Sequence, residues 1–267
     1  MKKYLSFFKI RFLNGLQYRM AAYAGVATQF AWGFMSLLMF SAFYKTKPEA
    51  FPMEFSQVSS YIWLQQAFLA LYMVWFLETD IFLAISNGNI AYELCRPIDL
   101  YNMWYAKNLA SRLSKAVLRC LPILLIAFFL PRPYGLSLPE NTITLLAFLL
   151  SMSLGVLVVI GICMLIYIAT FYTLSPMGVR IVAISFIDFF SGAVIPLPFL
   201  PDKTRIVLQL LPFASMQDIP FRVYCGHITG LDRVIGILLQ LFWLVFLITL
   251  GKFFMKKALK KIVVQGG

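Results

Sequence analysis

Long uncharged apolar runs recur along the chain, separated by shorter segments that carry its charges and many of its prolines. The clearest of these runs are residues 20–44, 55–77 and 141–179. About 20 apolar residues in a helix cross the hydrocarbon core of a bilayer, which is roughly 30 Å thick. The pattern therefore predicts an all-α integral membrane protein.

Six membrane-spanning helices are expected. The third is the least regular, because only residues 120–131 are free of charge. Its helix must begin earlier and let Arg119 extend towards the headgroups. The long fourth run reads as one helix, since no Pro or Gly cluster before Pro176 marks a turn. The six spans are predicted at about 20–44, 55–77, a segment ending near 131, 143–172, 178–195 and 234–251.

Basic residues predict the orientation. Residues 1–20 contain five of them, with apolar residues at helical spacing, which indicates an amphipathic helix in the membrane interface or else a cytosolic tail. If both termini are cytoplasmic, the inside segments hold 16 of the 23 Lys and Arg, including a basic tail at 252–261. Positive residues concentrate on the cytoplasmic side, so both termini are expected inside.

Composition excludes several classes of function. The chain is 61% hydrophobic and only 13% charged, far from a soluble domain. Its formal charge of +12 is explained by residues flanking membrane helices, so no nucleic-acid partner is expected. With one histidine, no CxxC pair and no phosphate-binding glycine loop, we expect no catalytic residue, metal or cofactor in this chain. Any dependence on ATP must come from another protein.

The largest predicted cytoplasmic segment is 79–116. Within it, residues 80–99 suggest a short amphipathic helix, a turn at Gly88 and a second helical turn that stops before Pro97. The turn needs a backbone that a side chain would strain, and Glu93 and Arg96 are spaced to face each other. The segment is either a handle for a soluble motor or an ordinary solvated loop.

A single carboxylate, Asp188, falls in the middle of the fifth predicted span. Ser185 and Ser191 lie three residues to either side, on the same general face. An ionised carboxylate in hydrocarbon is costly, so such residues usually face water or a partner. The alternatives are a residue lining a pathway and a structural hydrogen bond between helices.

Residues 196–230 form a segment that cannot be one continuous helix. Its apolar pieces are too short to cross a bilayer, and irregular backbone at membrane depth is tolerated only against protein or water. A re-entrant or surface-lying helical hairpin over a pathway exit is one interpretation, and a plain extracytoplasmic loop is the other. The residues that interrupt helix just before and within this segment include Gly192, Pro196, Pro198, Pro201 and Pro212.

Taken in order along the chain, these features resemble the membrane subunits of the ABC-2 family of ABC exporters. The segment from Gly88 to Ile98, with Glu93, Arg96 and Pro97, is similar to the family's coupling segment. The stretch from Ser191 to Phe213 is similar to the family's pattern after the fifth span. The Arg-Pro form resembles a bacterial subgroup whose operons hold two permeases with one ATPase.

The resemblance implies a permease in a bacterial inner membrane, paired with a second permease chain that is identical or homologous. A dimer of ABC ATPase subunits would bind ATP and Mg²⁺ and drive export of a drug, peptide or lipid-like substrate. A membrane-embedded enzyme acting on lipid-linked substrates is an alternative, but it would need more clustered acids than Asp188. A secondary transporter is another, and it usually needs several intramembrane charges and internal repeats.

Overall fold

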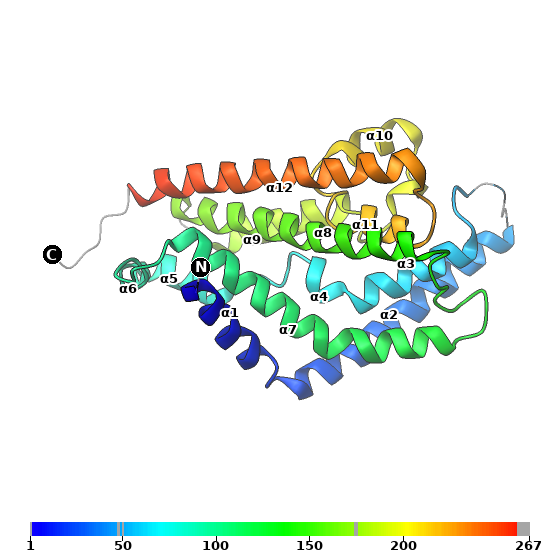
Figure 1. The fold of residues 1–267 in the computed structure, drawn as a ribbon, viewed down its shortest axis with the longest axis horizontal. Helices are drawn as coiled ribbons and strands as arrows, with labels where there is room; N and C mark the ends of the chain where they lie inside the picture. Colours follow the sequence, from blue (N-terminus) through cyan, green and yellow to red (C-terminus); the bar gives the residue numbers. More distant parts are fainter. Residues whose placement is uncertain (1, 47–48, 50, 174–175, 261–267) are drawn as a thin grey trace.

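The computed structural model describes residues 2–46, 49, 51–173 and 176–260, which form a bundle of α-helices (Figure 1). No strand occurs in these residues. The predicted Lys261 of the basic tail lies outside them. The helices are α1 (Lys2–Gly15), α2 (Arg19–Thr46), α3 (Phe55–Ala67), α4 (Leu69–Tyr72), α5 (Thr79–Ser86), α6 (Ile90–Leu94), α7 (Leu100–Phe129), α8 (Thr142–Ala169), α9 (Pro176–Phe190), α10 (Asp202–Leu210), α11 (Asp218–Tyr224) and α12 (Gly230–Leu259).

Three helices are long and apolar enough to cross a membrane: Arg19–Thr46, Thr142–Tyr172 and Gly230–Leu259. They coincide with the first, fourth and sixth predicted spans, and α8 is continuous as expected. The all-α class is therefore confirmed. The other three predicted spans correspond to shorter or more polar helices.

The second and fifth predicted spans are interrupted. In the second span, helix α3 ends at Ala67, and α4 adds only Leu69–Tyr72 before the backbone becomes extended at Met73. Helix α9 ends at Phe190, five residues before the predicted limit, because Gly192 adopts a φ of 77° that does not continue a helix.

The third predicted span is part of a longer helix than expected. Helix α7 begins at Leu100, so residues 100–116 of the predicted polar connection are helical. Asp99 caps its start, because its carboxylate accepts a hydrogen bond from Asn102 N at 2.8 Å. The connection between the second and third predicted spans therefore shrinks to the short helices α5 and α6.

Small residues allow the central helices to approach closely. A Cβ added at Gly161 of α8 would lie 3.0 Å from Leu247 Cβ of α12, and one at Gly236 of α12 would lie 3.1 Å from Ile219 of α11. Helix α8 lies between α7 and α12 and forms the centre of the largest hydrophobic cluster. Helix α1 packs along α7 without a buried residue of its own.

Candidate functional site

Helices α5 and α6 lie at the end of the molecule where the N-terminus and the last turn of α12 also lie (Figure 1). Gly88 joins them with a φ of 72°, the left-handed conformation that we expected, and apart from its chain neighbours no described residue lies within 4 Å of a Cβ placed there. The apolar side chains of Leu83, Tyr92 and Leu94 are exposed on this segment, Tyr92 by 75%. An exposed apolar surface on a short helical projection is typical of a protein contact.

Among the described residues, Glu93 and Arg96 form no ion pair with each other, and a contact of either with a partner protein stays a prediction. Glu93 accepts a hydrogen bond from the indole Nε1 of Trp104 at 2.6 Å, so it turns towards α7 instead. Arg96 Nη1 lies 4.0 Å from the sulfur of Met103. Because Trp104 is fully buried, Glu93 ties the exposed α6 to the core of the bundle.

Further bonds attach this segment to its surroundings. The carbonyl of Pro97 accepts a hydrogen bond from Lys3 Nζ at 3.5 Å, and the hydroxyl of Tyr4 accepts one from Asp99 N at 3.1 Å. At the start of α5, Asp80 pairs with the buried Lys107 of α7. The segment therefore contacts both α1 and α7.

The link before α5 is held by a side chain that the sequence analysis did not single out. Arg112 of α7 is 1% exposed and donates hydrogen bonds to the carbonyls of Leu71 and Met73 at 2.8 and 3.0 Å. Its second guanidinium nitrogen lies 3.2 Å from the sulfur of Cys163 in α8. Only the spacing of basic residues along α7 could have signalled it.

The three polar residues predicted on α9 do not form one site. Ser185 is exposed, Asp188 is half-buried and Ser191 is buried. The Ser191 hydroxyl donates to the backbone carbonyl of Asp188 at 3.3 Å, within the same chain segment. Across the described parts of the chain, no side chain donates a hydrogen bond to the Asp188 carboxylate.

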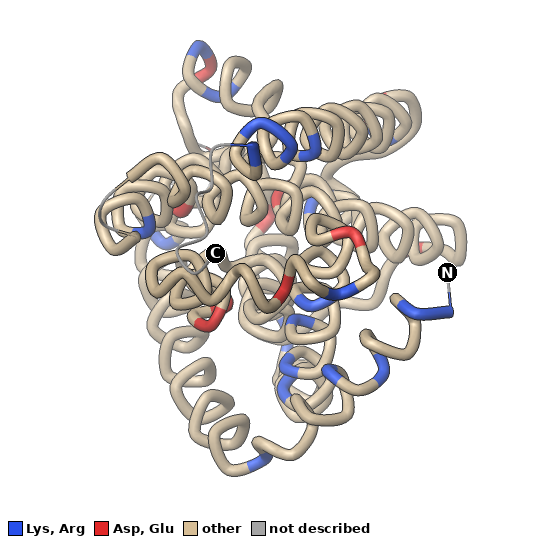
Figure 2. The backbone as a smooth tube through the Cα atoms, turned by 90° about the vertical axis from the view of Figure 1, so that its left-hand side faces the viewer, with Lys and Arg blue, Asp and Glu red and all other residues tan. Residues whose placement is uncertain are grey.

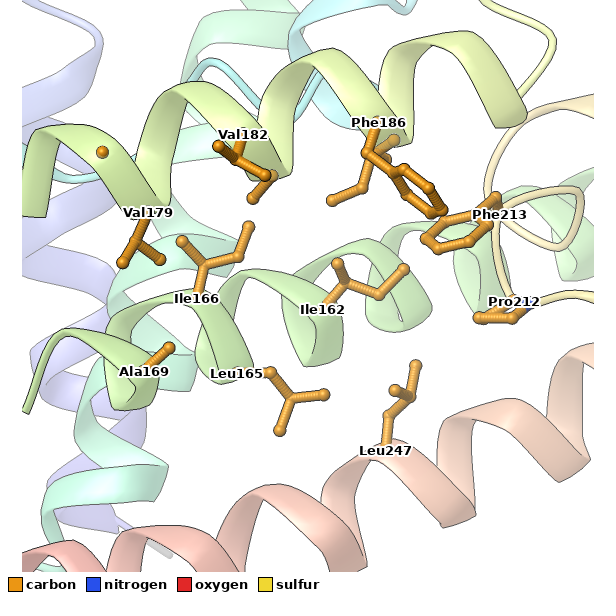
Figure 3. A pocket seen from close by; sticks show the side chains of 13 residues that line it. Ile162, Leu165, Ile166, Ala169, Val179, Val182, Phe186, Pro212, Phe213 and Leu247 are labelled. Carbon is orange, nitrogen blue, oxygen red and sulfur yellow. The ribbon is translucent and has the colours of Figure 1, made fainter. Parts of the chain in front are cut away.

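Beside these residues, α8, α9 and α12 enclose an apolar groove of about 680 Å³ (Figure 3). Val182 and Phe186 of α9 face Ile162 and Ile166 of α8 across it, and Phe213 closes one end. Pro212, one of the predicted exit residues, lies at the same end. Neither Ser185 nor Asp188 lines the groove.

The predicted exit region is a compact structure built on the bundle. Gly192 lies against Leu197 and the Tyr61 hydroxyl, and the carbonyl of Ala193 accepts a hydrogen bond from Gln65 at 2.7 Å. Pro196 and Pro198 are buried around a short 3₁₀ turn, Leu197–Phe199, and Pro201 precedes α10. Part of the segment therefore packs against α3.

A buried ionic network, also missed from the sequence, fixes α11. Asp218 is fully buried and accepts hydrogen bonds from Tyr61 and Arg222, both at 3.2 Å. Arg222 Nε donates to Nδ1 of His227 at 3.2 Å. Partial burial and the Arg222 charge lower the pKa of His227 to about 4. The four-residue spacing of Asp218 and Arg222 was visible in the sequence, but the contact between Asp218 and Tyr61 was not.

The loop before α11 is also joined to the long helices. Gln240 of α12 donates hydrogen bonds to the carbonyls of Ser151 and Ser215 at 3.0 and 2.9 Å. A Cβ on Gly155 of α8 would collide with the carbonyl oxygen of Met216. Within the described residues, no group of three or more His, Cys, Asp or Glu could hold a metal ion.

Comparison with known proteins gives the family. A search of curated proteins finds no match. The sequence profile described as "ABC-2 family transporter protein" matches residues 30–266, which is most of the chain and includes all helices from α3 onward. A match of this extent agrees with the apolar helices of the fold, and the chain belongs to the ABC-2 family of transporter membrane proteins.

Proposed function

We propose that this protein is the membrane-spanning permease subunit of an ATP-driven ABC exporter, with six spans and both termini in the cytoplasm. Membership of the family supports a transport permease. Six segments support the span number, since α2, α3, α7, α8, α9 and α12 run roughly along the long axis of the molecule (Figure 1). The interrupted α3 and short α9 are placed beside full-length helices.

The distribution of basic residues supports the orientation. Helix α1 carries several of them beside the N-terminus, as the view along the bundle from that end shows (Figure 2). The last turn of α12 adds Lys256 and Lys257. Cys95, which is exposed next to α6, offers a test. It should react with an impermeant thiol reagent only after permeabilisation, whereas a cysteine placed at Lys203 should react in intact cells.

The observation that carries the proposal is the α5–α6 projection. It exposes apolar side chains at its tip, while Glu93 and Asp80 join it to α7 through Trp104 and Lys107. In the proposed mechanism, an ABC ATPase dimer docks on this projection of two paired permease chains. ATP binding closes the ATPase subunits, and the differential affinity for the two permease states opens the pathway outward. ATP and Mg²⁺ belong to the ATPase.

Asp188 and the segment from Gly192 to Pro212 are proposed to act at the pathway and its exit. The unpaired Asp188 carboxylate supports a position near water or a second permease chain. The packing of residues 192–198 against α3, and of α11 against α8, supports a hairpin that remains folded while the pathway opens. A drug, peptide or lipid-like substrate is consistent with this arrangement.

The test is a complex purified with the ATPase, using the variants Gly88→Val, Glu93→Lys and Arg96→Glu. Gly88→Val strains the turn, and Glu93→Lys removes the acceptor of the Trp104 hydrogen bond. We expect normal membrane insertion with weaker ATPase association or with hydrolysis uncoupled from transport. Lys203→Gln, in α10 at the opposite end, serves as control. Normal transport by all three variants, or failure of any ATPase to co-purify with the wild type, would overturn the proposal.

A further inference from the structure

Three basic residues of α7 share one face and outnumber the acids opposite them. Arg112, Lys115 and Arg119 are spaced i, i+3 and i+7, which places them on one side of a helix. The facing link between α4 and α5, residues 73–78, contains one acidic residue, Glu78. Its carboxylate lies 3.8 Å from Lys115 Nζ. This part of the bundle therefore carries an excess of positive charge.

Arg112, the innermost cation, is occupied by the protein. Its hydrogen bonds go to backbone carbonyls and to the Cys163 sulfur, as described above. These partners accept from its two Nη atoms, while its Nε is buried without a partner among the described residues, and none of them neutralises its charge. The excess charge therefore favours an anion near the two outer cations.

Arg119 has unused donors. Across the described residues it makes no hydrogen bond or ion pair, and its Nε is buried without a partner. Its guanidinium lies 5.6 Å from the centre of the Phe76 ring, and Lys115 Nζ lies 5.3 Å from the same ring. On the other side, a Cβ at Gly25 of α2 would lie 2.8 Å from Arg119 Cζ. A planar group with five donors is thus held between an aromatic ring and a helix backbone, with hydrogen bonds still to be made.

The surroundings of this pair indicate the ligand. Gly15, at the end of α1, lies against Ser114, so the pair lies close to the junction of α1 and α2. Lys115 keeps 35% of its side chain exposed, which opens the pair to the side of the bundle. Further along the same side of α7, Ile126 and Phe129 are exposed at i+11 and i+14 from Lys115. Cations followed by an exposed apolar stripe match a lipid headgroup and its acyl chains.

We propose that Lys115 and Arg119 bind the phosphate of an anionic phospholipid, whose acyl chains lie along the exposed apolar side of α7. Arg119 supplies a planar set of donors to the phosphate oxygens, and Lys115 supplies a point charge. The ring of Phe76 makes cation–π contacts with both residues. This site requires only that the chain is embedded in a membrane, so it stands whether or not the protein is a transporter.

Native mass spectrometry of the detergent-purified full chain tests the site. We expect phosphatidylglycerol to bind at lower concentration than phosphatidylcholine. Arg119→Gln and Lys115→Gln should each weaken phosphatidylglycerol binding about tenfold, as loss of a charge-assisted hydrogen bond predicts. Arg119→Lys should retain part of it. Lys203→Gln makes the same charge change far from the site and should bind like the wild type.

Other results would overturn the proposal. Equal binding of the two lipids, or wild-type affinity in both glutamine variants, would exclude a specific headgroup site. Displacement of phosphatidylglycerol by inorganic phosphate at similar concentration would show that the cations take free phosphate rather than lipid. Size-exclusion chromatography identifies any variant that fails to fold. Lys115 lies nearer the surface, so its variant decides the outcome if Arg119→Gln does not fold.

Discussion

Helices α8 and α9 are neighbours in the sequence and both are largely apolar, yet they are buried to very different extents. In the most apolar stretch of α8, 67% of the residues are buried inside the chain. Helix α9, by contrast, has one buried residue, Ile187. Helix α8 contacts α7, α11 and α12, and α9 contacts mainly α8. The chain therefore builds its core around α8 and leaves α9 at its edge.

The glycines of the two helices show the same difference. Gly155 and Gly161 of α8 lie against the Met216 carbonyl and Leu247, while a Cβ placed on Gly178 of α9 would have no described atom from outside its own helix within 4 Å. We conclude that α8 is the fixed support of the bundle. Helix α9 packs against this support through Val179, Ala183 and Ile184, while Val182, Phe186 and Phe189 are exposed.

The largest effect on stability is expected at Arg112, which contacts α8 through Cys163. Arg112→Gln removes the donors to two buried carbonyls and the contact with Cys163 of α8. Hydrogen bonds from charged donors contribute roughly 1.5–3 kcal/mol each to stability. We therefore expect the free energy of unfolding to fall by about 3 kcal/mol, or the variant to fail to express.

The matched control is Arg180→Gln in α9, because Arg180 donates a single long bond of 3.4 Å to the Trp75 carbonyl. Its effect should stay within about 0.5 kcal/mol. Thermal unfolding in detergent gives both values. Similar melting of the two variants would remove the distinction between the helices.

A pair of identical substitutions should have opposite signs. Gly155→Ala forces a methyl group onto the Met216 carbonyl and should destabilise the fold by about 1–3 kcal/mol. Gly178→Ala meets no neighbour and should stabilise α9 by up to about 1 kcal/mol through helix propensity. The midpoints of thermal unfolding measure this, and equal shifts for both variants would mean that α8 is not tightly packed at Gly155.

Acidification should weaken the region around α11, which packs on α8. The pKa of His227 is about 4 in the folded protein, below the usual histidine pKa of 6.5. The unfolded chain therefore binds more protons between these values, and stability falls as the pH drops from 6.5 towards 4. The melting temperature should decrease between pH 7.5 and 5.5 in the wild type and decrease less in His227→Gln. An equal decrease in both would show that the only histidine of the chain does not report on this region.

The smallest effect on stability is expected at Asp188. Its carboxylate accepts no hydrogen bond from the described residues, so Asp188→Asn should change the melting temperature by less than Gly155→Ala does. Substrate-stimulated ATPase activity of the complex should nevertheless change if the residue faces a pathway. Unchanged activity in both Asp188→Asn and Asp188→Leu would leave the residue without a functional role.

Hydrophobic patterning predicted the fold best where a helix needs no partner to be recognised. Residues 143–172 were predicted as one helix because nothing interrupts them, and the structure has the continuous helix Thr142–Ala169 followed by a 3₁₀ turn at Thr170–Tyr172. Helix α7 was harder to predict, because the sequence shows the charges of Lys107 and Arg112 but not their partners. Lys107 pairs with the Asp80 carboxylate, and Arg112 donates to backbone carbonyls. No comparable sequence pattern marks the end of helix α3 at Ala67.

The candidate site was predictable only at the level of single residues. Gly88 could be assigned its turn because a positive φ favours glycine. The partner of Glu93 could not, since Trp104 is eleven residues away and competes with the nearby Arg96. Asp218 joins Tyr61 across 157 positions, a contact that only the tertiary fold creates.

The central claim is that the α5–α6 projection receives an ATPase, and photo-crosslinking tests it most directly. A benzophenone amino acid in place of Tyr92, which is 75% exposed at the projection, should crosslink to the ATPase subunit in the membrane. The same amino acid in place of Lys203, exposed in α10, should not. An ATPase adduct at position 92 alone would support the account. An adduct at position 203, or none at position 92, would contradict it.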